Sequence, residues 1–409
     1  MLWDGIKITT ANEFTKFSDM KKRFYAGDGI FPLIFVISFF VLGSAPSAKT
    51  VAANSMVGMQ EDSIQSHEFT PAFELKIGGE GFYSIEPATG NGFGGIAAIM
   101  VDMDASIHEH LDFFAAFHFD SALWDDFLNK PRLQREGLPP EHRIDLTVEE
   151  FFLSWIPMGE ILEIMAGRRF SGFSYANRLH LADFQFNMKP RIFTTYWGDN
   201  HGLALDGISL RVTLPNDGFS TSFMVEAAKS AYGGDQTVMT SVLDAGFSAG
   251  NLDIGLRGFG YFDHQTFCHP LLNYCNEDIS SQLTLDEGFA LNAFGGGTNL
   301  LWKTGGRKSV FFQAEWIGRR IMSNFLYGGY AFAKLVHSEK VSSSFMVQQL
   351  EMPDFLGEEP NGRIERSYNP GISYFPMEKH RFRLEYHYSD NSIYYRNMLL
   401  FKYTFFLDF

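Results

Sequence analysis

The sequence predicts an all-β fold, a transmembrane antiparallel β-barrel of about sixteen strands (14–18) preceded by an N-terminal signal peptide. Among its 409 residues are 43 Phe and 16 Tyr, a content that excludes a disordered chain. Apolar and polar residues alternate along most of the chain, which is the period of a strand with one apolar face. The mean hydropathy of −0.09 is too low for a bundle of membrane helices but suits strands that are half apolar.

Residues 1–53 are predicted to be a signal-peptide region. A basic cluster at 21–23 precedes an apolar run at 30–42, which is too short to span a bilayer as a helix. Small residues follow, and cleavage is expected near 47–53. Because Met20 opens this pattern, it is the expected start of translation. An uncleaved N-terminal anchor is the alternative.

The mature chain is predicted to form one domain, with a short periplasmic segment at 54–71 and the barrel at 72–409. The clearest hairpin joins two alternating strands, 381–388 and 399–409, through a Ser-Asp-Asn-Ser turn. Strands are expected to begin near residues 72, 93, 106, 144, 160, 201, 220, 237, 251, 288, 308, 325, 340, 366, 379 and 393. Short turns alternate with longer connections, as in outer-membrane barrels.

The strand faces favour a bilayer over a soluble β-sandwich. Faces rich in Phe, Tyr and Trp suit a lipid-facing surface with aromatic girdles. The opposite faces carry Arg, Glu, Asp and His, which a dry core would not accept unpaired but a water-filled lumen would. We therefore expect a protein of the bacterial outer membrane, with membrane lipid as a partner. The net charge of −15 argues against a nucleic-acid partner.

The chain ends in an alternating aromatic strand whose last residue is Phe409. This ending resembles the C-terminal signature of bacterial outer-membrane proteins. The resemblance implies that Phe409 is an assembly signal recognised by the barrel-assembly machinery.

The segment 167–180 has the sequence Gly-Arg-Arg-Phe-Ser-Gly-Phe-Ser-Tyr-Ala-Asn-Arg-Leu-His. It resembles a segment of a poorly characterised group of porin-like outer-membrane proteins, some of which are described as zinc-regulated. Shorter matches lie at 148–152, 206–208 and 382–386. The resemblance implies a porin-like channel. The chain departs from the group at its C-terminus, where the group often carries histidines.

Positive charge concentrates at residues 168–191, which overlap a long aromatic connection at 173–200. Folded inward, this connection would narrow the lumen and create a transverse field. A solvated extracellular loop is the alternative. Asn177 and His180 are expected to tie the segment down by hydrogen bonds. The candidates for lining the pore or its constriction are Arg168, Arg169, Arg178, Arg191, Arg211, Arg257 and Glu315.

A strand predicted at 107–119 carries His and Asp on its polar face. Imidazole and carboxylate groups two residues apart can converge on a divalent cation. The candidate ligands for a transient metal ion are His108, His110, Asp112, His118 and Asp120. A polar channel wall that holds no metal is the alternative, and no resident cofactor is expected.

The two cysteines, Cys268 and Cys275, lie close together in a polar stretch. An exported chain meets an oxidising compartment, so a disulfide across a short loop is expected. A metal site with His264 and His269 is the alternative.

The predicted function is passive or facilitated diffusion of small hydrophilic solutes, with metal ions or their chelates among the candidates. A homo-oligomer is expected by analogy with sixteen-stranded porins. A structural or interaction barrel, such as the sheath of an electron-transfer conduit or an adhesin-like surface protein, is the second interpretation. An outer-membrane barrel enzyme is the third, and no enzyme is expected because the sequence has no recognised catalytic motif.

Overall fold

The computed structural model describes residues 72–85, 92–121, 144–177, 190–197, 203–216, 218–230, 237–263, 290–305, 308–321, 324–352, 363–377, 379–390 and 397–408. The strands in these residues are β1 (Ala72–Ile85), β2 (Gly92–His108), β3 (Leu111–Ser121), β4 (Ile144–Trp155), β5 (Pro157–Glu160), β6 (Leu162–Phe170), β7 (Ala204–Asn216), β8 (Phe219–Ser230), β9 (Thr237–Ala249), β10 (Leu252–Asp263), β11 (Ala290–Gly305), β12 (Lys308–Ile321), β13 (Asn324–Val336), β14 (Val341–Met352), β15 (Arg363–Met377), β16 (His380–Asp390) and β17 (Asn397–Asp408). A short helix, α5 (Arg191–Trp197), lies between β6 and β7.

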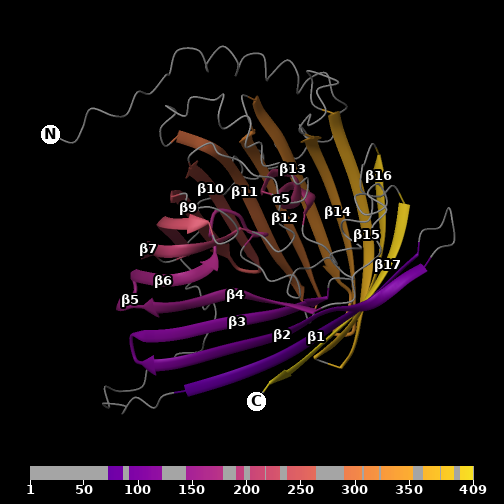
Figure 1. Cartoon of the computed structure of the whole chain (residues 1–409), viewed down its shortest axis with the longest axis horizontal. Coiled ribbons are helices and arrows are strands. Elements are labelled where there is room, and N and C mark those ends of the chain that lie inside the picture. The colour runs from indigo at the N-terminus through magenta and orange to yellow at the C-terminus, as the bar shows by residue number, and fades with distance from the viewer. Residues whose placement is uncertain are drawn as a thin grey trace. The chain divides into compact units, whose positions relative to one another are not determined.

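All of these strands except β5 form one closed antiparallel barrel of sixteen strands. Each strand pairs with its neighbour in the chain, and β1 closes the barrel by pairing with β17 (Figure 1). Closure leaves no open sheet edge, so every strand can satisfy its backbone hydrogen bonds in lipid. The predicted fold class is confirmed.

The two faces of each strand differ in polarity, as β16 shows. Arg383, Glu385 and His387 point into the barrel and are buried. The residues that alternate with them face outward and are exposed: Leu384, Tyr386 and Tyr388. The same apolar outer face recurs around the barrel, and it matches what a bilayer requires of a strand.

The two ends of the barrel carry connections of different length. One end has tight links such as those between β2 and β3 and between β9 and β10. The longest spans are all at the other end, at 122–143, 171–203, 264–289 and 353–362. Outer-membrane barrels keep short turns at the periplasm, so we call these the periplasmic end and the outer end.

The single strand predicted at 107–119 is wrong. The chain turns at Glu109 and His110, so that His108 ends β2 and Leu111 begins β3. A β-bulge between Ser106 and His108 adjoins this two-residue turn, and together they leave Ser106 and Asp112 paired on the lumenal face. The alternation therefore continues through the turn and does not reveal it.

Several predictions concern residues outside the described part of the chain. These are the signal-peptide region at 1–53, the segment at 54–71, Cys268, Cys275 and Phe409. Among the residues that are described, no helix has the length and hydropathy required for a membrane crossing.

A buried ion pair lies at the seam where the first and last strands meet. Lys402 Nζ lies 2.5 Å from Glu80 Oε2, and both side chains are buried. Thr404 Oγ1 donates to the other oxygen of Glu80 at 3.2 Å. The pair therefore links β1 to β17 inside the barrel.

We predict that Lys402→Met lowers the free energy of unfolding by about 3–5 kcal/mol, because it leaves a buried carboxylate without its cation. Denaturant unfolding of the refolded barrel in micelles, followed by tryptophan fluorescence, measures the loss. The double variant Glu80→Gln/Lys402→Met should recover most of it, since both charges are gone. Equal losses in the two variants would contradict this account of the seam.

Candidate functional site

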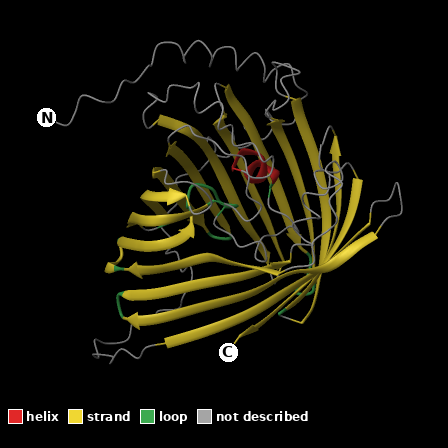
Figure 2. Cartoon of the chain, in the orientation of Figure 1, coloured by secondary structure: helices red, strands yellow, loops and turns green. Residues whose placement is uncertain are grey.

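The span from Ser171 to Leu203 is here called the inner loop, and the parts of it that the structure describes lie inside the barrel. Its described parts are 171–177, α5 with the preceding Pro190, and Leu203. Phe173, Ser174 and Asn177 are fully buried. Phe173 packs against Phe259 and Ser174 donates to Glu315, both of which are inward-facing side chains of the barrel wall. Helix α5 lies against β12, β13 and β14 (Figure 2). The prediction that this segment folds inward therefore agrees with the structure.

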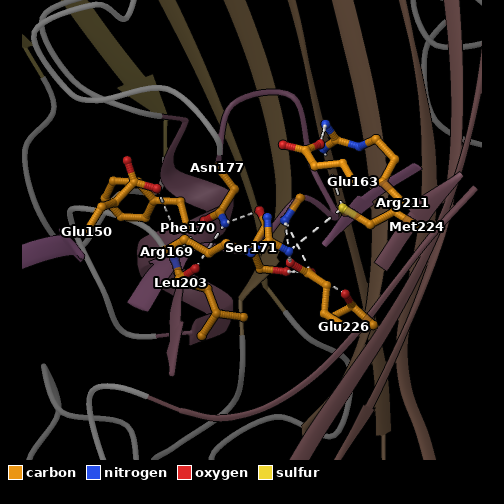
Figure 3. Close-up of polar contacts among 12 residues, drawn as sticks. Glu150, Glu163, Arg169, Phe170, Ser171, Asn177, Leu203, Arg211, Met224 and Glu226 are labelled. Atoms are coloured by element: carbon orange, nitrogen blue, oxygen red, sulfur yellow. Dashed lines mark hydrogen bonds and ion pairs between the residues drawn. The ribbon is translucent and has the colours of Figure 1, made fainter. Parts of the chain in front are cut away.

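Asn177 holds the two ends of the inner loop together. Its Nδ2 donates to the carbonyl oxygens of Ser171 at 2.8 Å and Leu203 at 3.1 Å (Figure 3). Its Oδ1 accepts from the backbone N–H of Leu203 at 2.6 Å. The backbone N–H of Ser171 also donates to Leu203 O at 2.9 Å. This is the tying role that the sequence predicted for Asn177.

Glu226 on β8 is the first anchor of the loop. Its carboxylate accepts from Ser171 Oγ at 2.5 Å and from the backbone N–H of Gly172 at 3.2 Å. Arg169 and Thr240 Oγ1 also donate to it. Figure 3 shows Arg169 and Ser171 meeting at this carboxylate. A buried charge with this many donors fixes the start of the loop to β8.

Glu315 on β12 is the second anchor. It accepts from Ser174 Oγ and from the backbone N–H of Tyr175, both at 2.7 Å, and from the N–H of Ala176 at 3.3 Å. The wall residue Tyr330 donates to the same carboxylate at 2.5 Å. The loop therefore extends from β6 to a strand about halfway around the barrel.

Arg257 on β10 lies between these anchors. It donates to Gly172 O at 3.0 Å, and its guanidinium stacks on the Tyr175 ring at 4.2 Å from the ring centre. Two further hydrogen bonds, of 2.6 and 2.9 Å, orient it on Asp244. Arg257 thus joins the loop backbone, a loop aromatic ring and the wall.

Apolar side chains also hold the loop against the barrel wall. The Phe173 ring lies 5.2 Å from that of Phe259 and 6.1 Å from that of Phe193, measured between centres. Glycine provides the space, because a Cβ at Gly297 would come within 2.6 Å of Glu315 Cγ and 3.3 Å of the Tyr175 ring. The glycine-rich part of β11 therefore admits both the anchor and the loop.

Helix α5 fastens the second part of the loop. The backbone N–H of Arg191 donates to Gln348 Oε1 at 2.7 Å, and its side chain forms a buried ion pair with Glu365. Tyr196 OH donates to Glu351 O at 3.3 Å. These contacts bring the helix to β14 and β15.

The wall formed by β1 to β4 differs from the wall under the loop. Its inward-facing Glu74 and Asp104 are exposed, and Asp112 is half-exposed. Nearer the middle of the barrel, Glu80 and Arg383 face inward but are buried. The inward carboxylates near the periplasmic end of β1–β4 are thus exposed, whereas the inward charges nearer the middle of the barrel are buried.

The pore-lining candidates fall into three groups. Arg169, Arg191, Arg257 and Glu315 hold the inner loop. Arg211 faces the lumen and pairs with Glu163 at 2.8 Å. Arg178 lies outside the described residues.

Arg168 lies on the outer face of the barrel and not in the lumen. It forms a paired hydrogen bond with Asp206, at 2.7 and 2.9 Å, and Asp206 shares its strand face with the outward Ile208. Gly167, at φ +133°, passes so close to β4 that a Cβ would lie 2.2 Å from Phe151 O. Only glycine fits there, and Arg168 follows on the outward side.

The five candidate metal ligands do not form one cluster. His108 and His110 lie at the periplasmic turn with ring centres 5.9 Å apart. His118 is buried beside Glu149 at 3.2 Å, seven residues and about 24 Å along β3 from that turn. The side chain of Asp120 is not described. Within the described part of the chain, no three His, Cys, Asp or Glu side chains are placed to hold a metal ion.

Sequence reasoning missed Glu226. Its alternation with Val225 and Ala227 would have placed it in the lumen, but nothing local to β8 shows that a loop 55 residues earlier binds it. The partners of Glu315 are hidden in the same way by a separation of about 140 residues.

Comparison with known proteins gives structural matches alone. No protein-family model matches the chain, and no curated protein has a matching sequence. Pseudomonas putida OprB matches with a TM-score of 0.57 at 12% identity, over 83% of this chain and 94% of that one. Salmonella typhi OmpF, in a complex with daunomycin, matches at 0.54 and 12%, over 83% and 97%. An anion-selective porin from Comamonas acidovorans matches at 0.50 and 9%, over 83% and 99%.

The chain has the barrel fold of the bacterial outer-membrane porins. The apolar outer surface of the closed barrel agrees with the predicted location in the outer membrane. The narrower resemblance to the zinc-regulated group stays a prediction, as do recognition by the barrel-assembly machinery and the disulfide.

We predict that Glu315→Ala frees the inner loop locally. The amide hydrogens of Tyr175 and Ala176 should exchange with deuterium faster, because both donate to this carboxylate. Hydrogen–deuterium exchange with mass spectrometry on the refolded barrel measures this. Glu163→Ala, a wall change next to Arg211, is the control and should leave the loop protected. Unchanged exchange in the Glu315 variant would refute the anchoring role.

Proposed function

We propose that the protein is an outer-membrane diffusion channel for small hydrophilic solutes, narrowed by the inner loop. The observation that carries this proposal is the difference between its two inner walls. The loop covers the wall from β8 to β15, whereas carboxylates on β1–β4 face the lumen and remain exposed to water. A closed barrel with a wet inner wall and a side narrowed by a loop is suited to passive, size-limited passage.

Charge on the inner wall supports a role in solute orientation. Arg381, Arg383 and Lys334 lie close enough to one another for their charges to interact. Around the lumen from them, β1–β3 carry Glu74, Asp104 and Asp112. Opposite charges on different parts of the wall produce a transverse field that orients polar solutes as they pass.

Metal ions and their chelates are one class of solute that such a channel could carry, but the proposal does not depend on them. The described His and Asp side chains form no metal cluster. The sheath, the adhesin-like barrel and the enzyme stay as alternative predictions. A homo-oligomer fits the apolar outer surface, and we include it in the proposal.

Planar bilayers test the proposal directly. We predict that the refolded protein gives discrete, ohmic current steps in KCl, because the lumen is wet and the loop leaves part of it uncovered. The same preparation left unfolded should give none. A folded barrel that inserts without any current would contradict the channel and favour the sheath.

A further inference from the structure

Two phenylalanines interrupt the polar lining along β3 and β4. Phe114 on β3 and Phe152 on β4 are register partners and share the face of Asp112 and Ser154, which points inward. Their ring centres lie 5.4 Å apart with a tilt of 39°, and both rings are half-exposed. An apolar pair that faces water inside a channel is a candidate contact surface for solutes.

Acidic residues surround this aromatic pair on neighbouring strands. Asp104 on β2 is the register partner of Phe114, and Glu74 lies next to Asp104 in the same row, one strand further on β1. Asp112 lies one step towards the periplasmic end, and its charge repels that of Asp104. Asp102 and Glu150 lie in the row on the other side. Neighbouring strands are about 4.8 Å apart and alternate residues about 7 Å apart, so these carboxylates frame the rings closely.

A single basic residue, Lys76, belongs to these three rows of β1–β4. Its Nζ lies 5.4 Å from the centre of the Phe406 ring. The local charge around the Phe pair is therefore strongly negative. The field of the wall raises the concentration of cations at the rings.

We propose that Phe114 and Phe152, with Asp104 and Asp112, form a lumenal binding station for organic cations. The faces of aromatic rings attract ammonium and guanidinium groups, and the carboxylates add charge attraction. The inference rests on the proposed channel function and names a solute class for it. An inorganic divalent ion fits less well, since no three acidic or histidine side chains in the described residues are placed to coordinate it.

The same two strands supply a matched control. Phe113 and Phe151 also pair across β3 and β4, with ring centres 5.2 Å apart, but they occupy the outer face. Replacing both phenylalanines of a pair by leucine keeps the side chains apolar and removes the aromatic rings. The variant of the first pair therefore loses rings inside the lumen, and the variant of the control pair loses rings on the outer face.

The experiment measures block of the KCl current by choline added to single channels in a planar bilayer. Choline should block wild type, and its uncharged analogue 3,3-dimethyl-1-butanol should not. Phe114→Leu/Phe152→Leu should raise the half-blocking concentration about two- to fivefold, while Phe113→Leu/Phe151→Leu leaves it unchanged. Asp104→Asn/Asp112→Asn should raise it as well.

The KCl current is recorded first, and absence of current in wild type would contradict the proposed channel function alone. In that case, calorimetry of choline binding to the refolded barrel in micelles, with the same variants, still tests the binding station. With current present, equal block in wild type and the Phe114/Phe152 variant would overturn the station alone. Equal block by the uncharged analogue would also overturn it, as would an equal effect of the outer-face variant.

Discussion

Two buried carboxylates on the barrel wall, Glu226 and Glu315, hold a stretch of backbone inside the lumen. A chain that leaves its strand and enters a barrel carries N–H groups that need acceptors. Glu226 accepts from Gly172, and Glu315 accepts from Tyr175 and Ala176. Without these acceptors residues 171–177 would lose most of their polar contacts with the barrel wall.

The rest of the wall is adapted to that arrangement. Gly297 leaves room for Glu315 and for the Tyr175 ring, and Arg257 neutralises charge between the two anchors. Further along, Arg191 attaches α5 to Glu365. On the other side of the barrel, exposed carboxylates and the Phe114–Phe152 pair face the water. The inner surface is thus divided into a side that supports the loop and a side whose carboxylates and aromatic rings stay exposed.

Local alternation in the sequence was sufficient to predict the strands, and most observed strands begin within four residues of the predicted positions. It failed at Glu109–His110 because the two-residue turn and the β-bulge beside it together keep Ser106 and Asp112 on one face, so that the alternation in the sequence is unbroken. Roles that depend on distant partners were not predictable. The sequence suggested that Arg191 lines the pore. In the structure it forms an ion pair with Glu365, 174 residues later, and so holds α5 to the barrel wall. The outward placement of Arg168 was within reach of the sequence, because on β6 it alternates with the inward-facing Met165 and Arg169.

The anchored loop is expected to set the width of the lumen. Liposome swelling with a series of sugars of increasing size measures that width directly. We predict a size limit for wild type and a clearly higher limit for Glu226→Ala/Glu315→Ala, because the loop loses both acceptors and is no longer held against β8 and β12. If the double variant folds and admits the same largest sugar as wild type, the anchored loop does not set the width.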